Sequence, residues 1–394
     1  MASAGTIAAL AELALPTVSD PALRRIGSKL VAGTRLDQAD GHAMYRSHDL
    51  LGLGALADAV NRAKHGDVVT FASNQHINPT NICVLRTTCT FCGYARLPKE
   101  AGAYRYTLAQ VLGEASNAAD GLTREFHIVG GLDMQAGLEY YQEMFRALKA
   151  NFPHVHIKAL TAVEIAHIAR IEKMSWTDVL IALREAGLDT MPGGGAETFS
   201  AAVRDRIAGK KLAGADYIGV HRAAHALGIR SNCTMLYGHV ETLDDRMEHL
   251  QMLRDLQDET GGFLAYIPLA YHPDDNELGR ELLRQGQATG GVDDLKMLAV
   301  GRLFLDNFAH VKSHWIMVSQ AVSQVALHFG VNDLEGTVVR EKIYHAVGAH
   351  TPQAMTLDAI LGLIRGAGKI PAERDSFYNI LRTFDAAAPV PVPA

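Results

Sequence analysis

Hydrophobic positions along the chain fall into two alternating patterns. Short, nearly continuous apolar runs are typical of buried strands, and stretches with an apolar residue every three or four positions are typical of amphipathic helices. The predicted strands are 68–72, 125–129, 156–160, 190–191, 231–236, 263–267 and 311–317. The predicted helices include 138–150, 176–186, 216–227, 244–259 and 293–307.

The repeated alternation of strand and helix predicts an α/β fold with parallel strands and crossover helices. A TIM-like (β/α) barrel accounts for this rhythm better than a doubly wound sheet, because no break or switch in the pattern interrupts it. We place the barrel core at 66–332, between an N-terminal helical extension at 1–65 and a C-terminal helical cap at 333–385. The last residues, 386–394, are rich in Pro and Ala and are predicted to form a disordered tail.

Polar and glycine residues recur where the predicted strands end. In a barrel, the carboxyl ends of the strands form the face on which active sites are built, so these residues are expected to lie together. They are the loop 83–92, Gly130, Gly131, Glu164, the segment 193–195, His239 and His272.

Three of the four cysteines, Cys83, Cys89 and Cys92, lie within ten residues of one another, and Cys233 lies far from them. Three thiolates on one loop can hold a soft metal centre, either an iron–sulfur cluster or zinc. A cluster with three protein ligands leaves one iron open to a substrate, which indicates chemistry instead of electron storage. Cys233 fits a buried strand residue.

Zinc is the serious competitor to a cluster. A structural zinc site usually has four ligands, so His76 or Cys233 would have to complete it. That alternative predicts a zinc-dependent hydrolase or a zinc-stabilised barrel. A disulfide framework is disfavoured, because three clustered cysteines leave an odd thiol.

Composition narrows the class of partner. The chain has 394 residues, of which 48% are hydrophobic, and a formal net charge of −6. An acidic chain is a poor match for nucleic acid or for an anionic membrane surface. No apolar run reaches the length of a membrane span, and the N-terminal stretch lacks the basic residues of a signal peptide. Because sparse cysteine fits a reducing compartment, the predicted location is cytoplasmic.

The chain resembles the radical S-adenosylmethionine superfamily in three features: the cysteine loop, the polar residues at the ends of the predicted strands, and the adjacent glycines Gly130 and Gly131. The resemblance implies that the three clustered cysteines hold a 4Fe–4S cluster whose open iron binds S-adenosylmethionine. Phe91 precedes the last cysteine, as an aromatic residue usually does in that superfamily, and Gly130-Gly131 matches its glycine pair. The C-x5-C-x2-C spacing has two more residues than the usual C-x3-C-x2-C, an insertion that a loop absorbs at small cost.

Longer phrases resemble the branch of that superfamily that makes menaquinone by the futalosine route. They include His76-Ile-Asn-Pro-Thr-Asn81, His127-Ile-Val-Gly-Gly-Leu132, Met191-Pro-Gly-Gly-Gly-Ala-Glu197 and Pro268-Leu-Ala-Tyr-His272. The resemblance implies a transferase that adds the 5′-deoxyadenosyl group of S-adenosylmethionine, a consumed co-substrate, to 3-[(1-carboxyvinyl)oxy]benzoate, giving 6-amino-6-deoxyfutalosine. The alternative within the branch is a cyclic dehypoxanthine futalosine synthase, which abstracts hydrogen and cyclises its substrate.

The strand-end positions and the resemblance together suggest roles for individual residues. The candidates for catalysis are Glu164, His239 and Glu197. The candidates for cofactor binding are Phe91, Gly130, Gly131, Glu164 and Tyr237. The substrate carries two carboxylates, which call for cations or strong hydrogen-bond donors. The candidates for contact with it are His76, Arg86, Lys158, His272 and His314.

The predicted partners follow from the same resemblance. They are a small aryl enolpyruvyl ether dicarboxylate and a reducing electron donor such as flavodoxin or ferredoxin. Neither nucleic acid nor a membrane is expected, and a homodimer is compatible with the sequence. Asn78 and Asn81 are predicted to pin the cysteine loop through hydrogen bonds to its backbone.

Overall fold

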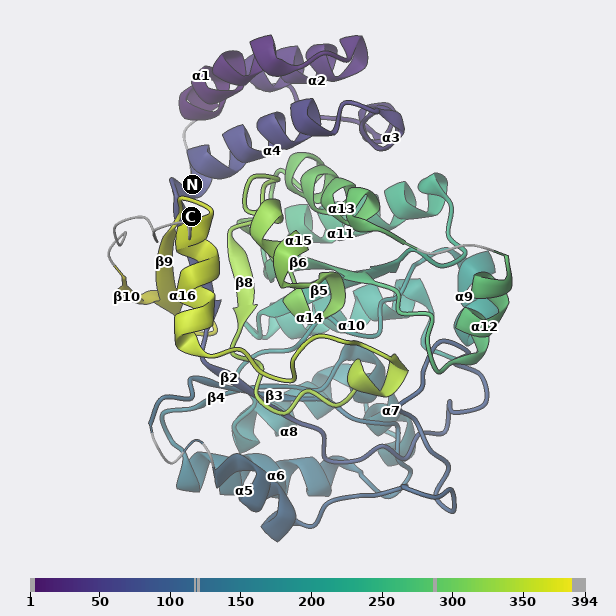
Figure 1. Cartoon of the computed structure of the whole chain (residues 1–394). Helices are drawn as coiled ribbons and strands as arrows, with labels where there is room; N and C mark the ends of the chain where they lie inside the picture. Colours follow the sequence, from purple (N-terminus) through teal and green to yellow (C-terminus); the bar gives the residue numbers. More distant parts are fainter. Residues whose placement is uncertain (1–3, 117, 119–120, 286–288, 385–394) are drawn as a thin grey trace.

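The computed structural model describes residues 4–116, 118, 121–285 and 289–384, so the predicted tail at 386–394 lies outside the described residues. Strands lie inside a layer of helices, and the four N-terminal helices gather at one end, at the top of Figure 1. These helices are α1 (Ala4–Ala14), α2 (Pro21–Val31), α3 (Gln38–Arg46) and α4 (Leu50–His65). None of the described helices is both long and apolar enough to cross a membrane.

Parallel strand pairing closes into a ring. The consecutive strands β1 (Val68–Ala72) and β2 (Asn74–Ile77) meet β8 (Asp333–Gly336) and Val339 on one side, and β2 meets β3 (Glu125–Ile128) on the other. The remaining members in order around the ring are β4 (His156–Ala159), residues 190–191, β5 (Ser231–Tyr237), β6 (Phe263–Ala270) and β7 (His310–Val311). A bridge between Lys312 and Asp333 returns the ring to β8, which confirms the predicted barrel.

Helices connect the strands and cover the outside of the barrel (Figure 1). They are α5 (Leu108–Ala115), α6 (Leu138–Asn151), α7 (Ala162–Glu172), α8 (Trp176–Ala186), α9 (Ala201–Ala208), α10 (Gly214–Ala226), α11 (Leu243–Thr260), α12 (Glu277–Arg284), α13 (Gly291–Phe304), α14 (Trp315–Val318), α15 (Gln320–Ala326) and α16 (Leu357–Gly366). Local sequence sets their ends. The Thr161 and Thr242 hydroxyls accept backbone N–H groups in the first turns of α7 and α11, and Gly187 ends α8 with φ 118°.

Two sequence predictions differ from the structure. The strand predicted at 311–317 ends at Val311, and the chain enters α14 at Trp315, because a short apolar run does not distinguish a buried strand from a buried helix. The C-terminal segment is helical only in part, since it also contains β8, β9 (Ile370–Arg374) and β10 (Ile380–Thr383). β8 and β9 carry buried charged residues, which hide the usual alternation of a strand.

The strands bury several charged side chains, and these side chains are paired with one another. Lys158 Nζ lies 2.6 Å from Glu125 Oε2, and each side chain is only 1% exposed. The other buried pairs are Lys312 with Glu335 and Arg374 with Asp333. A buried charge is tolerated only with a partner, so these pairs join neighbouring strands.

We expect Glu125→Gln to lower the free energy of unfolding by about 3–5 kcal/mol, because it leaves the Lys158 ammonium buried without a countercharge. Urea unfolding followed by circular dichroism measures the loss. The control is Glu259→Gln, which breaks a pair with Arg222 in which both side chains are 48% exposed. That surface change should cost far less than the buried one, and equal losses in the two variants would contradict this account.

Candidate active site

A cavity of about 270 Å³ opens at the carboxyl ends of the strands. It lies where the sequence predicted the functional face of the barrel. Most of the predicted site residues line it: His76, Cys83, Cys89, Phe91, Cys92, Gly130, Gly131, Glu164, Glu197, His272 and His314. Arg86, Lys158, Tyr237 and His239 are not among the side chains that line it.

The three clustered cysteines face this one cavity as free thiols. Hydrogen bonds hold their loop, with Cys83 N donating to Arg96 O at 2.9 Å and Cys92 N donating to Cys89 O at 3.2 Å. Burial raises the pKa of Cys89 to about 12, so its thiol is protonated until a metal displaces the proton. Binding of a metal by this loop would therefore release the proton of Cys89.

Two asparagines just before the cysteine loop bond backbone groups that lie outside the loop, whereas the sequence analysis predicted bonds to the loop's own backbone. The Asn81 side chain donates to Gly102 O at 2.9 Å and accepts from Tyr104 N at 2.8 Å. The Asn78 side chain donates to Val129 O at 2.9 Å, next to the glycine pair. These side chains replace the regular ladder that an irregular loop lacks.

The glycine pair lets the cysteine loop approach β3 closely. A Cβ on Gly131 would lie 2.2 Å from the carbonyl oxygen of Ile82, and one on Gly130 would lie 2.8 Å from that of Thr80. Gly131 N also donates to Thr80 O at 2.9 Å. Because only glycine has no Cβ, the pair brings the metal-binding loop against the end of the strand.

The carboxyl group of Glu164 joins the glycine pair to helix α7. It accepts hydrogen bonds from Gly130 N at 2.9 Å, from Thr161 N at 2.7 Å and from Thr161 Oγ1 at 2.8 Å. Burial nevertheless raises the pKa of Glu164 to about 7, because desolvation outweighs these hydrogen bonds. Glu164 thus caps helix α7, and near pH 7 its carboxyl group in the cavity is partly protonated.

Lys211 is a functional candidate that the sequence analysis missed. Its ammonium group binds the carboxylate of Glu197 and lies 5.2 Å from the centroid of the Phe91 ring. Its positive charge also opposes the effect of burial on the Cys89 thiol. Lys211 follows another lysine just after α9, a position typical of a surface side chain, so no sequence signal pointed to it.

Two of the predicted residues outside the cavity lining have other partners. Arg86 Nε lies 3.5 Å from Glu100 Oε2, and both side chains are partly exposed. Lys158 is held in its buried pair with Glu125. Neither cation faces the cavity, so neither is placed to grip a ligand there.

The other two predicted residues outside the cavity lining, Tyr237 and His239, lie at the end of β5 and in the turn after it. His239 Nδ1 accepts a hydrogen bond from Val240 N at 2.7 Å, and its Nε2 lies 3.1 Å from Leu236 O. The Tyr237 hydroxyl donates to Asp294 Oδ1 at 2.6 Å. Both side chains are buried and face neighbouring protein groups. Strand-end position alone predicted them, and it does not tell which way a side chain points.

The donor set fits an iron–sulfur cluster better than a single zinc ion. Within the part of the chain that the structure describes, only His76, His127 and Glu335 bring three ligand atoms within 4.8 Å of one another. The three thiol sulfurs are therefore spread more widely. A Zn–S bond of about 2.3 Å limits the separation of two sulfurs on one ion to about 4.6 Å. Cys233, the other proposed zinc ligand, is fully buried and does not line the cavity.

Comparisons with known proteins identify the superfamily that the cysteine loop and the glycine pair resemble. The model of the radical SAM superfamily matches residues 77–253, and that of the CofH/MqnC C-terminal region matches residues 260–386. The aminodeoxyfutalosine synthase of Thermus thermophilus is 44% identical over 93% of this chain and 98% of its own length. The cyclic dehypoxanthine futalosine synthase of Streptomyces coelicolor is 37% identical over 94% of this chain and 92% of its own length.

A solved structure shares the fold at low identity. Methylornithine synthase matches with a TM-score of 0.69 and 16% identity, over 88% of this chain and 97% of that one. This likeness shows the barrel fold and carries no information about the substrate.

We expect Gly131→Ala to reduce iron bound after reconstitution about 10-fold or more, because the new methyl group would displace the Ile82 carbonyl and the cysteine loop with it. Iron and sulfide per chain measure the effect. The control is Gly113→Ala on helix α5, where a Cβ meets no atom within 4 Å. The control should keep its iron and gain up to about 1 kcal/mol of stability. Normal iron in the Gly131 variant would contradict this role.

The raised pKa of Glu164 makes stability depend on pH. The carboxyl group of Glu164 keeps its proton up to about pH 7 in the folded state, whereas its ordinary pKa is 4.5. Its protonation therefore stabilises the folded state fully below pH 4.5, and this stabilisation is lost as the pH rises to 7. Relative to Glu164→Gln, the free energy of unfolding should fall by about 3 kcal/mol across that window and then stay level. Denaturant titrations at several pH values measure the difference. A difference independent of pH would contradict the raised pKa.

Proposed function

The chain belongs to the radical S-adenosylmethionine superfamily, as its sequence predicted, and on that premise we propose that it has aminofutalosine synthase activity. The activity adds the 5′-deoxyadenosyl group of S-adenosylmethionine to 3-[(1-carboxyvinyl)oxy]benzoate and yields 6-amino-6-deoxyfutalosine. The identity of 44% with an aminodeoxyfutalosine synthase over nearly the whole of both chains carries this proposal.

The cysteine loop would hold the cluster through Cys83, Cys89 and Cys92. When bound, a 4Fe–4S cluster supplies one electron to S-adenosylmethionine and thereby a 5′-deoxyadenosyl radical. The chain's own contribution is to place the co-substrate against the glycine pair, with Phe91 and Glu164 beside it. The ammonium of Lys211, next to Phe91, adds positive charge near these thiolates.

The rest of the cavity suits an aryl ether. Apolar and aromatic side chains line it and would exclude water from a reactive radical. They include Leu85, Ile267, Leu269, Tyr271, Met317, Ile343 and Tyr344. Two bound reactants held against each other in this space need no diffusive encounter, which favours addition to the vinyl carbon.

Charge balance limits what the titratable residues must do. S-adenosylmethionine carries a net charge of +1 and the aryl substrate −2, while methionine, carbon dioxide and the monocarboxylate product sum to the same −1. The overall conversion therefore balances without a net proton or electron, and the electron supplied at the start is recovered when carbon dioxide is lost. The overall balance therefore requires no net proton from Glu164 or Glu197, and we assign both a role in positioning bound groups.

Among the candidates for binding the substrate carboxylates, His76, His272 and His314 line the cavity. His272 Nε2 lies 2.9 Å from Met317 O, which fixes the orientation of its ring. We assign substrate contact to these three histidines and give Lys158 a structural role. The finer partners are also part of the proposal: a flavodoxin or ferredoxin as electron donor, a homodimer, and the cytoplasm, where thiols stay reduced.

Product analysis tests the proposal. Anaerobic enzyme reconstituted with iron and sulfide should convert S-adenosylmethionine, reductant and the aryl ether into methionine and an aryl–adenosyl adduct detectable by mass. Cys89→Ala should form no adduct, because it removes one of three cluster ligands. The matched control is Cys233→Ala, a buried cysteine away from the cavity, which should keep its iron and its activity.

Two outcomes would contradict the proposal. Free 5′-deoxyadenosine without adduct would transfer the assignment to hydrogen abstraction, as in the cyclic dehypoxanthine futalosine synthases that the chain also resembles. A colourless protein that does not cleave S-adenosylmethionine would show that the loop holds no cluster.

A further inference from the structure

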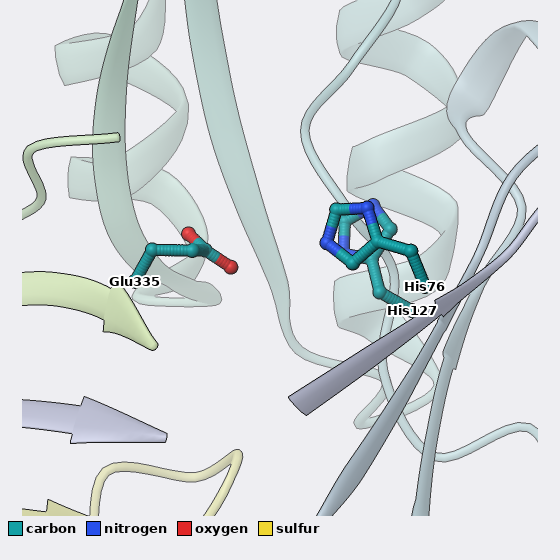
Figure 2. Close-up of side chains that lie close together, drawn as sticks. All are labelled: His76, His127 and Glu335. Atoms are coloured by element: carbon teal, nitrogen blue, oxygen red, sulfur yellow. The ribbon is translucent and has the colours of Figure 1, made fainter. Parts of the chain in front are cut away.

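The cavity has a second polar region, apart from the cysteine loop. His76 on β2, His127 on β3 and Glu335 on β8 bring their ligand atoms within 4.8 Å of one another. Figure 2 shows the carboxylate of Glu335 directed toward the two imidazole rings. All three residues line the cavity, as does His314.

The imidazoles in this region have unused hydrogen-bonding atoms. His76 Nε2, His127 Nδ1 and His314 Nδ1 are buried, and none of these three atoms has a partner in the structure. The His76 and His314 residues are only 7% and 6% exposed. A buried polar atom without a partner costs about 1–3 kcal/mol, so three of them around one cavity indicate a ligand with polar atoms.

Glu335 adopts a backbone conformation that glycine would accept more easily. Its φ is 64°, in the left-handed region, yet the residue carries a full side chain and is 95% buried. The Asn74 side chain donates to its Oε1 at 3.1 Å, and Lys312 Nζ lies 2.8 Å from its Oε2. Backbone strain of this kind persists where the surroundings need the residue, as in ligand sites.

Ring geometry argues against a metal ion shared by the two histidines. The His76 and His127 rings stack, with centroids 4.6 Å apart and an interplanar angle of 18°. A metal bound to imidazole lies in the plane of the ring, and one ion cannot lie in two nearly parallel planes several ångströms apart. Both oxygens of Glu335 also already face donor groups. The ligand is therefore one that accepts hydrogen bonds from the rings.

The charges around the imidazoles indicate how an anion could be held. The charged groups that act electrostatically on the three imidazoles are Glu125, Lys158, Lys312, Glu335 and Glu341. Three carboxylates against two ammonium groups leave an excess of one negative charge. An added anion would increase that excess, whereas an anion accompanied by a proton on one imidazole would not. Burial lowers the pKa of His314 to about 4 and also lowers those of His76 and His127, so the empty site is uncharged at these rings.

We propose that His76, His127 and His314 form the receptor for one carboxylate of the aryl substrate, and that one of these imidazoles takes up a proton when the carboxylate binds. The inference rests on the proposed function, which supplies the aryl dicarboxylate. The apolar walls next to this region hold the aromatic ring, and the Tyr344 ring, 5.3 Å from that of His314, closes one side. Glu335 is a positioning residue whose charge stabilises the imidazolium.

Calorimetry tests proton uptake without turnover. The cluster-loaded enzyme with S-adenosylmethionine, but no reductant, is titrated with 3-[(1-carboxyvinyl)oxy]benzoate in buffers of different ionisation enthalpy. We expect about one proton taken up per ligand near pH 7.5 and a Kd that rises about 10-fold from pH 7 to 8. Monoesters at either carboxylate identify the one that is recognised, since only one ester should abolish the uptake.

Variants separate this receptor from other titrating groups. At least one of His76→Gln, His127→Gln and His314→Gln should lose the proton uptake and bind about 10-fold more weakly at pH 7, while thermal melting checks that each variant folds. The control is His225→Gln, a histidine away from the cavity whose two ring nitrogens already lie 2.7 Å and 2.8 Å from Thr260 and Ser231 hydroxyls. The control should keep the proton uptake and the substrate affinity of the wild-type enzyme.

The outcomes distinguish this inference from the proposed function. Binding and adduct formation without proton uptake, or uptake unchanged in all three variants, would overturn the receptor and leave the synthase activity standing. Absence of both binding and adduct in the wild-type enzyme would overturn the proposed function itself.

Discussion

The close approach of the cysteine loop to the end of β3 is the constraint on which the site depends. Carbonyl oxygens of the loop occupy the space where side chains at 130 and 131 would begin, so only glycine is tolerated there. Glu164 fastens the same glycine pair to α7, and the Asn78 side chain bonds Val129 O just before the pair. The metal ligands, the expected co-substrate contacts and the helix cap are thus a single packed unit, and a shift in one displaces the others.

The barrel separates structural charges from functional ones. Lys158, Lys312 and Arg374 are buried and bound to carboxylates of neighbouring strands, so they stabilise the barrel and are not free to bind a ligand. The cavity above retains histidines, whose neutral rings can be buried without a countercharge and can still become cationic when an anion arrives. This division leaves the cavity with few permanent cations and with several neutral histidines.

The sequence predicted the barrel and the face on which the three clustered cysteines lie, because hydrophobic periodicity and residue spacing are local signals. It could not predict which strand-end side chains face the cavity. His239 and Tyr237 sit at a strand end like His272, yet their side chains bond to neighbouring protein atoms. Lys211 and Glu335 escaped notice because their roles come from contacts between distant segments, and β8 and β9 were hidden by charged residues in buried strands.

The central claim is that the adenosyl carbon becomes bonded to the vinyl carbon of the aryl substrate. S-adenosylmethionine labelled with ¹³C and two deuterium atoms at the 5′ position, incubated with reduced enzyme and an aryl ether labelled with ¹³C at the vinyl CH2, tests it directly by NMR and mass spectrometry. The account predicts a single product with coupled ¹³C nuclei and both deuterium atoms retained. Label recovered instead in free 5′-deoxyadenosine that has gained a hydrogen from the substrate would contradict it.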